Sequence, residues 1–264
     1  MIDKSATRKI PPRRRSRPRE PAVRRAAPSR AGHPSQDPLE RMRDESSLAI
    51  HELRAPLTVA EGYLSLLIDG SLGPGPSAWS EALEIVAEKL ATANLLVNDL
   101  LLLGQLNSGR DELRLQDLDL VGVAGAACDR AKGRAEQIGA TFTLEADQAE
   151  VRALADERMV AILIDNLLNN ALNYGGSEPP VIIRVGRSPE PYISITDHGR
   201  GIAASARGRI FERFFRVADS SPQPGSGLGL YLCTGLATRQ GGTVALDWSE
   251  LGQGSTFTLR LRAA

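Results

Sequence analysis

Four asparagines recur within one short stretch of the 264-residue sequence, at Asn166, Asn169, Asn170 and Asn173. The spacing i, i+3, i+4 and i+7 places them on one face of a helix, beside an apolar stripe. Asparagine disfavours a helix interior by up to about 0.7 kcal/mol relative to alanine, and a solvated face more naturally carries Glu, Lys and Arg. The amides therefore favour a ligand-binding face, although for this helix alone an ordinary solvated face remains an equal alternative.

Two glycine-containing segments further along the chain have the pattern of a phosphate or nucleotide site. The β-rich residues 192–196 lead directly into Asp197, Gly199 and Gly201. Glycine after a strand permits close backbone approach to a ligand, and a buried aspartate can accept a hydrogen bond. Residues 224–229 contain three further glycines at the start of a helix, where free N–H groups bind phosphate. Between them, residues 202–224 mix phenylalanines with arginines, which is typical of a hinged lid.

His51 lies in an earlier helical segment and has the properties of a nucleophile. It is about 160–200° around the helix from the apolar Ala49 and Leu53, and so faces away from the apolar seam. An imidazole can offer a neutral nitrogen for attack at cytosolic pH, and Glu52 can orient the ring and accept its proton. Taken alone, His51 would be interpreted as a solvated surface histidine.

The remaining patterns indicate the elements that position these residues. Helical periodicity over residues 38–70 and 79–106, with a break at 71–77, predicts an antiparallel hairpin whose apolar seam is buried in a dimeric four-helix bundle. Packing of the hairpin on its own chain is the alternative. The later sequence predicts an α/β sandwich, with helices on one face of a mixed sheet, so the whole chain is α+β. The predicted strands are 113–120, 141–144, 181–185, 192–196, 243–248 and 255–261, and the predicted helices are 121–138, 157–174 and 227–240.

The N-terminal region differs from the rest in composition. Residues 1–40 carry eleven basic and four acidic side chains, so the formally neutral chain divides into +7 and −7. We expect residues 1–36 to be a disordered basic tail, residues 37–110 to be the hairpin domain and residues 113–264 to be the sandwich domain. The sequence offers neither a signal-peptide pattern nor an apolar run of about 20 residues, and its two cysteines fit a reducing compartment. These features predict a cytoplasmic protein.

The asparagine helix and the two glycine segments, in this order, resemble the ATP-binding domain of sensor histidine kinases and of the related gyrase, heat-shock-chaperone and mismatch-repair ATPases. Residues 50–58, IHELRAPLT, resemble the phosphoacceptor box of the histidine kinases. The resemblance implies ATP and Mg²⁺ as cofactors, His51 as phosphoacceptor and Glu52 as its base. It also implies that Asn170 holds the metal. The nucleotide-binding residues that it implies are Asn166, Asn170, Asn173, Tyr174, Asp197, Gly199, Gly201, Ile202, Phe211, Arg213, Arg216, Gly225, Ser226, Gly227, Leu228 and Gly229.

Within that resemblance Asp197 would bind the adenine amino group, and Tyr174 would lie against the base. Asn173 stands where relatives commonly have Lys or Arg, so that charge is absent or comes from elsewhere, with Arg213 and Arg216 as candidates. Ala55 replaces the Thr or Asn that relatives often have four residues after the phosphoacceptor, which predicts weak phosphatase activity.

The resemblance also implies partners. We expect a homodimer that passes a phosphoryl group to an aspartate in the receiver domain of a separate response regulator. No sensor domain is expected in the chain, so the input would arrive through a separate sensory protein or the tail, which could contact anionic lipid or nucleic acid. Two alternatives remain: a protein serine kinase or ATPase of the same superfamily, and a non-catalytic nucleotide-gated scaffold.

Overall fold

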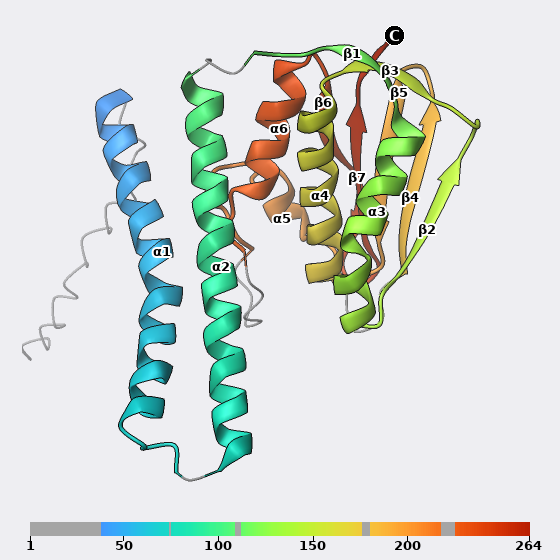
Figure 1. The fold of residues 1–264 in the computed structure, drawn as a ribbon. Coiled ribbons are helices and arrows are strands. Elements are labelled where there is room, and N and C mark those ends of the chain that lie inside the picture. Colours follow the sequence, from blue (N-terminus) through green and yellow to red (C-terminus); the bar gives the residue numbers. More distant parts are fainter. Residues whose placement is uncertain (1–37, 74, 109–111, 176–179, 218–224) are drawn as a thin grey trace, which may run out of the picture. The chain divides into compact units, whose positions relative to one another are not determined.

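The computed structural model describes residues 38–73, 75–108, 112–175, 180–217 and 225–264, of which residues 46–264 belong to one compact unit (Figure 1). The predicted tail over residues 1–36 lies outside the described residues. Within the described part, no helix is both long enough and apolar enough to cross a membrane.

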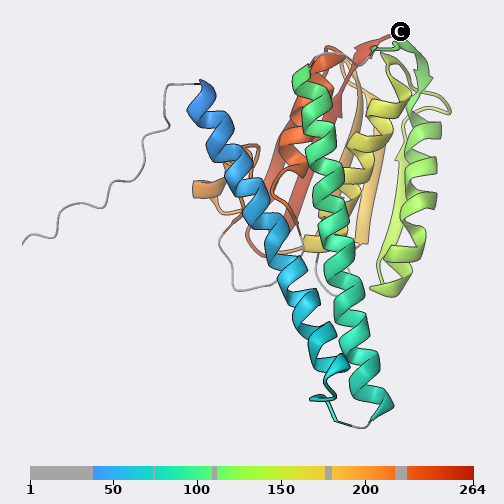
Figure 2. The same cartoon turned by 60° about the vertical axis from the view of Figure 1, so that its left-hand side comes forward.

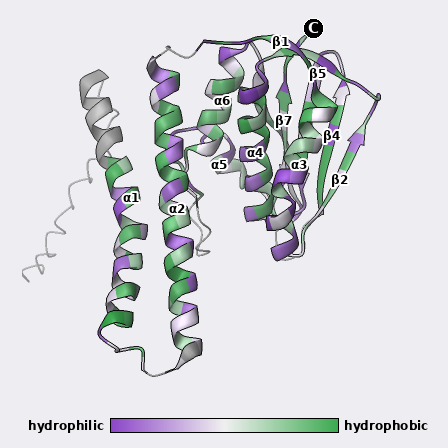
Figure 3. Cartoon of the chain, in the orientation of Figure 1, coloured by the Kyte–Doolittle hydropathy of each residue, from purple (hydrophilic) through white to green (hydrophobic). Residues whose placement is uncertain are grey.

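Two long helices form the antiparallel hairpin that the periodicity predicts. Helix α1 spans Pro38–Ile68 and helix α2 spans Pro76–Ser108, and they lie side by side in Figures 1 and 2. At the turn between them, the indole nitrogen of Trp79 donates to the carbonyl oxygen of Gly73 at 3.0 Å. The hairpin residues that the chain itself buries are mostly small, and several leucines on the same helices stay exposed. Figure 3 shows that hydrophobic residues, in green, recur along both helices. The buried set includes Ala49, Ala60, Ala82, Val86 and Ala93, and the exposed set includes Leu57, Leu64, Leu83, Leu90 and Leu101.

The second half of the chain is a mixed sheet with helices on one face, as expected (Figures 1 and 2). The strand order is β2-β4-β5-β7-β6, in which β2 and β4 run parallel and the other neighbours run antiparallel. The strands are β2 (Thr141–Ala146), β4 (Pro180–Arg187), β5 (Pro191–Asp197), β6 (Thr243–Glu250) and β7 (Gly254–Arg260). The covering helices are α3 (Leu120–Gln137), α4 (Glu157–Tyr174) and α6 (Gly229–Arg239).

A second, three-stranded sheet was not predicted. It has the order β1-β3-β8, built from β1 (Gln116–Asp119), β3 (Arg152–Ala155) and β8 (Arg262–Ala263). Strand β1 is shorter than the strand predicted over residues 113–120. It ends at Asp119 because this residue caps α3, where its carboxylate accepts from the backbone nitrogens of Val121 and Gly122. The short helix α5 (Ala204–Arg207) was also not predicted.

The core between helices and sheet consists of aliphatic side chains. Leu163, Ile164, Leu167 and Leu168 of α4 are fully buried in the same cluster as strand residues such as Ile193. Burial of each such side chain contributes about 1.5–3 kcal/mol. Since these four residues occupy one side of α4, the packing fixes which side of the helix carries the asparagines.

Candidate functional site

Helix α4 presents its asparagines to a pocket. The helix has the bounds that the periodicity predicts, and Asp156 caps it by accepting from the backbone nitrogen of Met159 at 3.1 Å. The other carboxylate oxygen of Asp156 accepts from Arg114 N at 2.9 Å, and its backbone nitrogen donates to Gln240 Oε1 at 3.1 Å. These bonds tie the start of α4 to the preceding chain and to the end of α6, so α4 has a defined position.

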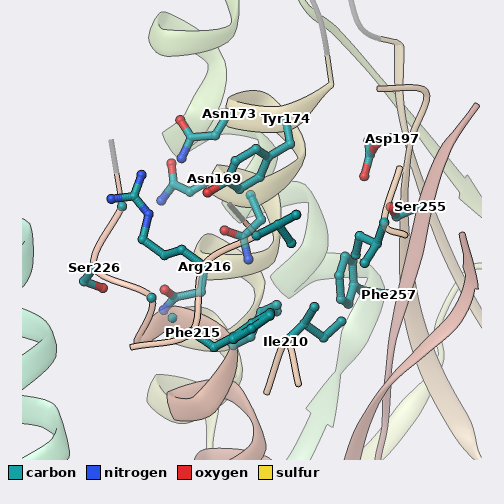
Figure 4. Close-up of a pocket in the computed structure, with 18 of the residues that line it drawn as sticks. Asn169, Asn173, Tyr174, Asp197, Ile210, Phe215, Arg216, Ser226, Ser255 and Phe257 are labelled. Carbon is teal, nitrogen blue, oxygen red and sulfur yellow. The ribbon is translucent and has the colours of Figure 1, made fainter. Parts of the chain in front are cut away.

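The pocket collects residues from seven separate stretches of the described chain (Figure 4). In Figure 4, Asn169, Asn173 and Ser226 lie toward one side and Asp197 and Ser255 toward the other, above the side chains of Ile210, Phe215 and Phe257. The lining residues are Leu95, Asp99, Arg134, Asn166, Asn169, Asn170, Asn173, Tyr174, Asp197, Arg200, Gly201, Ile202, Ile210, Phe215, Arg216, Val217, Gly225, Ser226, Gly227, Gly229, Leu230, Ser255 and Phe257.

Most of the residues expected to bind nucleotide line this pocket. Those are Asn166, Asn170, Asn173, Tyr174, Asp197, Gly201, Ile202, Arg216, Gly225, Ser226, Gly227 and Gly229. Gly199, Phe211, Arg213 and Leu228 do not line it. Phe211 instead packs edge-on against Phe257, with ring centroids 6.4 Å apart, and Arg213 donates to the Tyr231 hydroxyl at 2.7 Å. Leu228 is fully buried in a cluster with Leu96 and Leu232.

The glycines after β5 are required by contacts within the chain rather than by space for a ligand. A Cβ on Gly199 would collide with the carbonyl oxygen of Tyr174, and a Cβ on Gly201 would collide with that of Glu250. Gly201 also has a φ of +64°, which side-chain-bearing residues rarely adopt. The backbone nitrogen of Arg200 donates to Tyr174 O at 3.2 Å, so the segment is bonded to the end of α4. The glycines therefore let this segment lie against α4 and the β6–β7 turn.

Asp197 is a buried carboxylate at the edge of the pocket. Desolvation raises its pKa above the ordinary value, while hydrogen bonds from the backbone nitrogens of Gly199 and Ser255 lower it, and the net direction is upward. The bond from Gly199 N is 3.0 Å long. A carboxylate held in this way can accept a further hydrogen bond from a ligand.

The glycine-rich segment before α6 leaves the start of that helix open. No side chain caps α6, and Gly227 has a φ of +70°. A Cβ on Gly229 would come within 3.0 Å of Asn166 Oδ1, while Asn166 Nδ2 donates to its own helix at Ile162 O, 3.0 Å away. The α6 terminus and the asparagine face thus approach closely, and uncapped helix N–H groups favour an anion there.

Two domain models match the sequence of this chain. Residues 41–109 match the His Kinase A (phospho-acceptor) domain, and residues 155–264 match the histidine kinase-, DNA gyrase B- and HSP90-like ATPase. The chain belongs to the histidine kinases. The alginate biosynthesis sensor protein KinB of Pseudomonas aeruginosa is 34% identical over 224 residues, which cover 84% of this chain and 37% of KinB. The chain thus spans a little over a third of the length of the curated relatives that it matches.

Solved histidine kinase structures have the same fold. Full-length ShkA in complex with AMPPNP is 26% identical, with a TM-score of 0.58 over 84% of this chain and 47% of ShkA. ThkA, solved with the response regulator protein TrrA, is 18% identical, with a TM-score of 0.69 over 86% of this chain and 63% of ThkA. The 18% identity to ThkA supports a shared fold alone.

The predicted phosphoacceptor lies on the hairpin, outside the pocket lining. His51 is exposed on α1, as its position off the apolar seam predicts, and Glu52 beside it is half-buried. Neither residue lines the pocket of this histidine kinase.

Several pocket residues were not anticipated. Arg134 reaches the asparagine face from α3, and Asp99 of α2 accepts a 2.6 Å hydrogen bond from the Ser226 hydroxyl. The apolar side of the pocket uses Phe215 and Phe257 in place of the expected Phe211. Arg134 occurs as one charged residue in the last turn of an amphipathic helix, which carries no local signal of a ligand.

Proposed function

We propose that this protein is an ATP-dependent histidine autokinase that phosphorylates His51 and transfers the phosphoryl group to an aspartate of a separate response regulator. The observation that carries the proposal is the pocket in which the asparagine face, Asp197 and the open start of α6 meet, in a chain whose hairpin exposes a histidine. The AMPPNP complex of ShkA supports a nucleotide in the corresponding domain, and the match of residues 41–109 to the His Kinase A (phospho-acceptor) domain supports phosphorylation of the hairpin.

The residues of the pocket fit Mg-ATP. We assign Asp197 to the adenine amino group, Tyr174 to the base, and the Gly225–Gly229 segment with Asn166 to the phosphates. Asn170 lines the pocket without a side-chain hydrogen bond to any other described residue, so its amide oxygen is available as the hard ligand that Mg²⁺ prefers. When bound, the metal ion would neutralise charge on the phosphates.

The chemical step needs the hairpin as well as the pocket. A neutral nitrogen of His51 would attack the γ-phosphorus as the bond to the ADP oxygen breaks, and Glu52 would accept the imidazole proton. The product is a phosphohistidine and ADP. The exposed leucines of the hairpin favour a homodimeric four-helix bundle, since a lone hairpin leaves them in water.

We propose the division of the chain into tail (1–36), hairpin (37–110) and ATP-binding domain (113–264), in the cytoplasm. The tail would be a second contact, to anionic lipid, nucleic acid or a sensory partner. Ala55, exposed on α1, offers neither hydroxyl nor amide, so we expect phosphatase activity toward the regulator to be weak.

The stability of the bound phosphate tests the proposed function. Incubation of the protein with γ-labelled ATP and Mg²⁺ is expected to give a labelled protein whose label is lost in acid and retained in base, because a phosphoramidate is acid-labile. EDTA should prevent labelling. An acid-stable label would indicate a hydroxyl acceptor and the serine-kinase alternative, and ATP binding without label would indicate the non-catalytic scaffold.

Replacement of Asp197 by Asn should weaken ATP binding about 10- to 100-fold, because a charge-assisted hydrogen bond to the adenine is lost. In the wild type, affinity should also fall as pH is lowered through the raised pKa of Asp197, since the carboxylate is the accepting form. The effect of Asp197 on the free energy of unfolding has the opposite pH dependence to its effect on ATP affinity. Because its raised pKa means that the folded state binds the proton more tightly than the unfolded state, Asp197 favours folding at low pH, and this stabilisation is lost as pH rises through the raised pKa.

Titration of adenosine binding in both proteins, downward from neutral pH over the range in which both stay folded, measures this effect and avoids titration of the ATP phosphates. The Asp197→Asn variant should show a flatter profile than the wild type. Parallel profiles would remove Asp197 from base recognition.

A further inference from the structure

Arg134 of α3 extends across to the asparagine face of α4. Its guanidinium donates to Asn169 Oδ1 at 2.6 Å and to Asn173 Oδ1 at 2.5 Å, and the side chain lines the nucleotide pocket. Both partners are neutral amides. In the described part of the chain Arg134 forms no ion pair with a carboxylate, so its positive charge has no protein counter-charge at bonding distance.

Arg130, one helical turn earlier, provides a contrast. It crosses between the same two helices but pairs with the carboxylate of Asp165 at 2.8 Å, with both side chains well exposed to solvent. That pair is an ordinary surface ion pair between α3 and α4, worth about 0–1 kcal/mol. A half-buried arginine held only by amides is different, because burial disfavours its charged form and lowers the pKa of Arg134 below the ordinary value for arginine.

The surroundings of Arg134 indicate an anionic ligand. The same pocket contains the uncapped start of α6 at Gly229, the neighbouring Asn166 and two further arginines, Arg200 and Arg216. Its two carboxylates, Asp99 and Asp197, are each engaged elsewhere, with Ser226 and with Gly199. A guanidinium offers five donors in a planar fork, and only two of its N–H groups are used by Asn169 and Asn173, so donors remain for phosphate oxygens.

We propose that Arg134 binds the phosphates of the nucleotide, and that Asn169 and Asn173 are positioning residues that hold its guanidinium. This inference rests on the proposed nucleotide function. In this arrangement Asn173 contributes to phosphate binding indirectly, by holding Arg134. The positive charge beside the phosphates comes from Arg134 of α3 and not from residue 173 of α4.

The test compares nucleotides that share the base and differ in charge. In the full chain, Arg134→Gln is expected to weaken ATP and ADP binding about 10- to 100-fold while adenosine affinity stays unchanged, and to make ATP binding less dependent on salt. Arg134→Lys should retain part of the affinity. The matched control is Arg130→Gln, which removes the surface pair on the same helix and should leave all three affinities unchanged.

A second variant distinguishes a phosphate contact from a purely structural bridge between α3 and α4. Since Asn173 Oδ1 lies within hydrogen-bond distance of the guanidinium, Arg134→Gln combined with Asn173→Lys places an ammonium at nearly the same location and should restore much of the preference for ATP over adenosine. A structural bridge would not be restored in this way. Wild-type protein that binds neither adenosine nor ATP would contradict the proposed function itself. Wild-type ATP affinity in Arg134→Gln, or equal losses for ATP and adenosine, would overturn the role of Arg134 alone.

Discussion

Replacement of His51 by Gln is expected to abolish the acid-labile phosphorylation completely while ATP affinity and folding remain near wild type. The amide nitrogen of glutamine has no lone pair available for attack on phosphorus, so no substitute acceptor exists at this position. His51 is exposed on α1 and absent from the pocket lining, so its replacement leaves no cavity and removes no nucleotide contact. Surface changes of this kind usually alter stability by no more than about 0.5 kcal/mol.

Labelling with γ-labelled ATP, ATP affinity and thermal unfolding, measured on the same preparation, check this prediction. His198→Gln is the matched control, because His198 is also exposed and does not line the pocket, so its replacement should leave the label in place. An acid-labile label that persisted in His51→Gln would place the acceptor elsewhere and contradict the assignment of the hairpin.

Replacement of Gly201 by Ala is expected to destabilise the protein by about 3 kcal/mol or more, and to reduce nucleotide binding with it. The φ of +64° alone costs an L-residue about 1–2 kcal/mol. The added Cβ would also meet the carbonyl oxygen of Glu250, a backbone atom that cannot rotate away. The segment is bonded on both sides of Gly201, since Arg200 O accepts from Gly252 N at 2.8 Å and Ile202 N donates to Ser249 Oγ at 2.8 Å. Any shift of Gly201 therefore strains both bonds and moves pocket residues.

Gly252 is a close control for this effect. It has a φ of +75°, but a Cβ there would meet nothing within 4 Å. Gly252→Ala should therefore cost only the conformational term, about 1–2 kcal/mol, and leave ATP affinity unchanged. Denaturant titration measures the free energy of unfolding of both variants. The difference between the two values is the cost of the contact between the new Cβ at residue 201 and Glu250 O. Equal values would show that the backbone at Gly201 adjusts more easily than its contacts indicate.

The elements with strong local signals were predicted closely. Helix α4 has the predicted bounds because apolar periodicity, the asparagines and the capping Asp156 all act within a few residues of one another. The sequence does not predict strands β3 and β8, because segments of four and two residues are too short to show an alternation of polar and apolar side chains. These strands form because β3 pairs with β1 on one side and with β8 on the other, and the sequence near them does not encode that pairing.

The described part of the predicted lid, residues 202–217, shows the same limit at the level of side chains. Of its three phenylalanines, the sequence alone predicts only Phe211 as a nucleotide-binding residue. In the structure Phe211 and Phe215 both pack against the sheet core, and Phe215 also lines the pocket, whereas Phe214 packs against the cluster of Leu96 and Leu232. Hydrophobicity is the same for all three rings, so it does not specify which of them reaches the pocket.

The sequence by itself determined the chemistry of this histidine kinase: a histidine exposed on a hairpin, a face of amides, a strand ending in Asp197 and a glycine-rich helix start. Those signals are local, since helical period, strand propensity and glycine conformation depend on neighbouring residues. Only the tertiary structure decided that Arg134 meets Asn169 and Asn173, 35 and 39 residues away, and that the glycines after β5 serve packing against α4. Such contacts depend on how separate helices and strands pack, and the spacing of residues along the chain does not specify that packing.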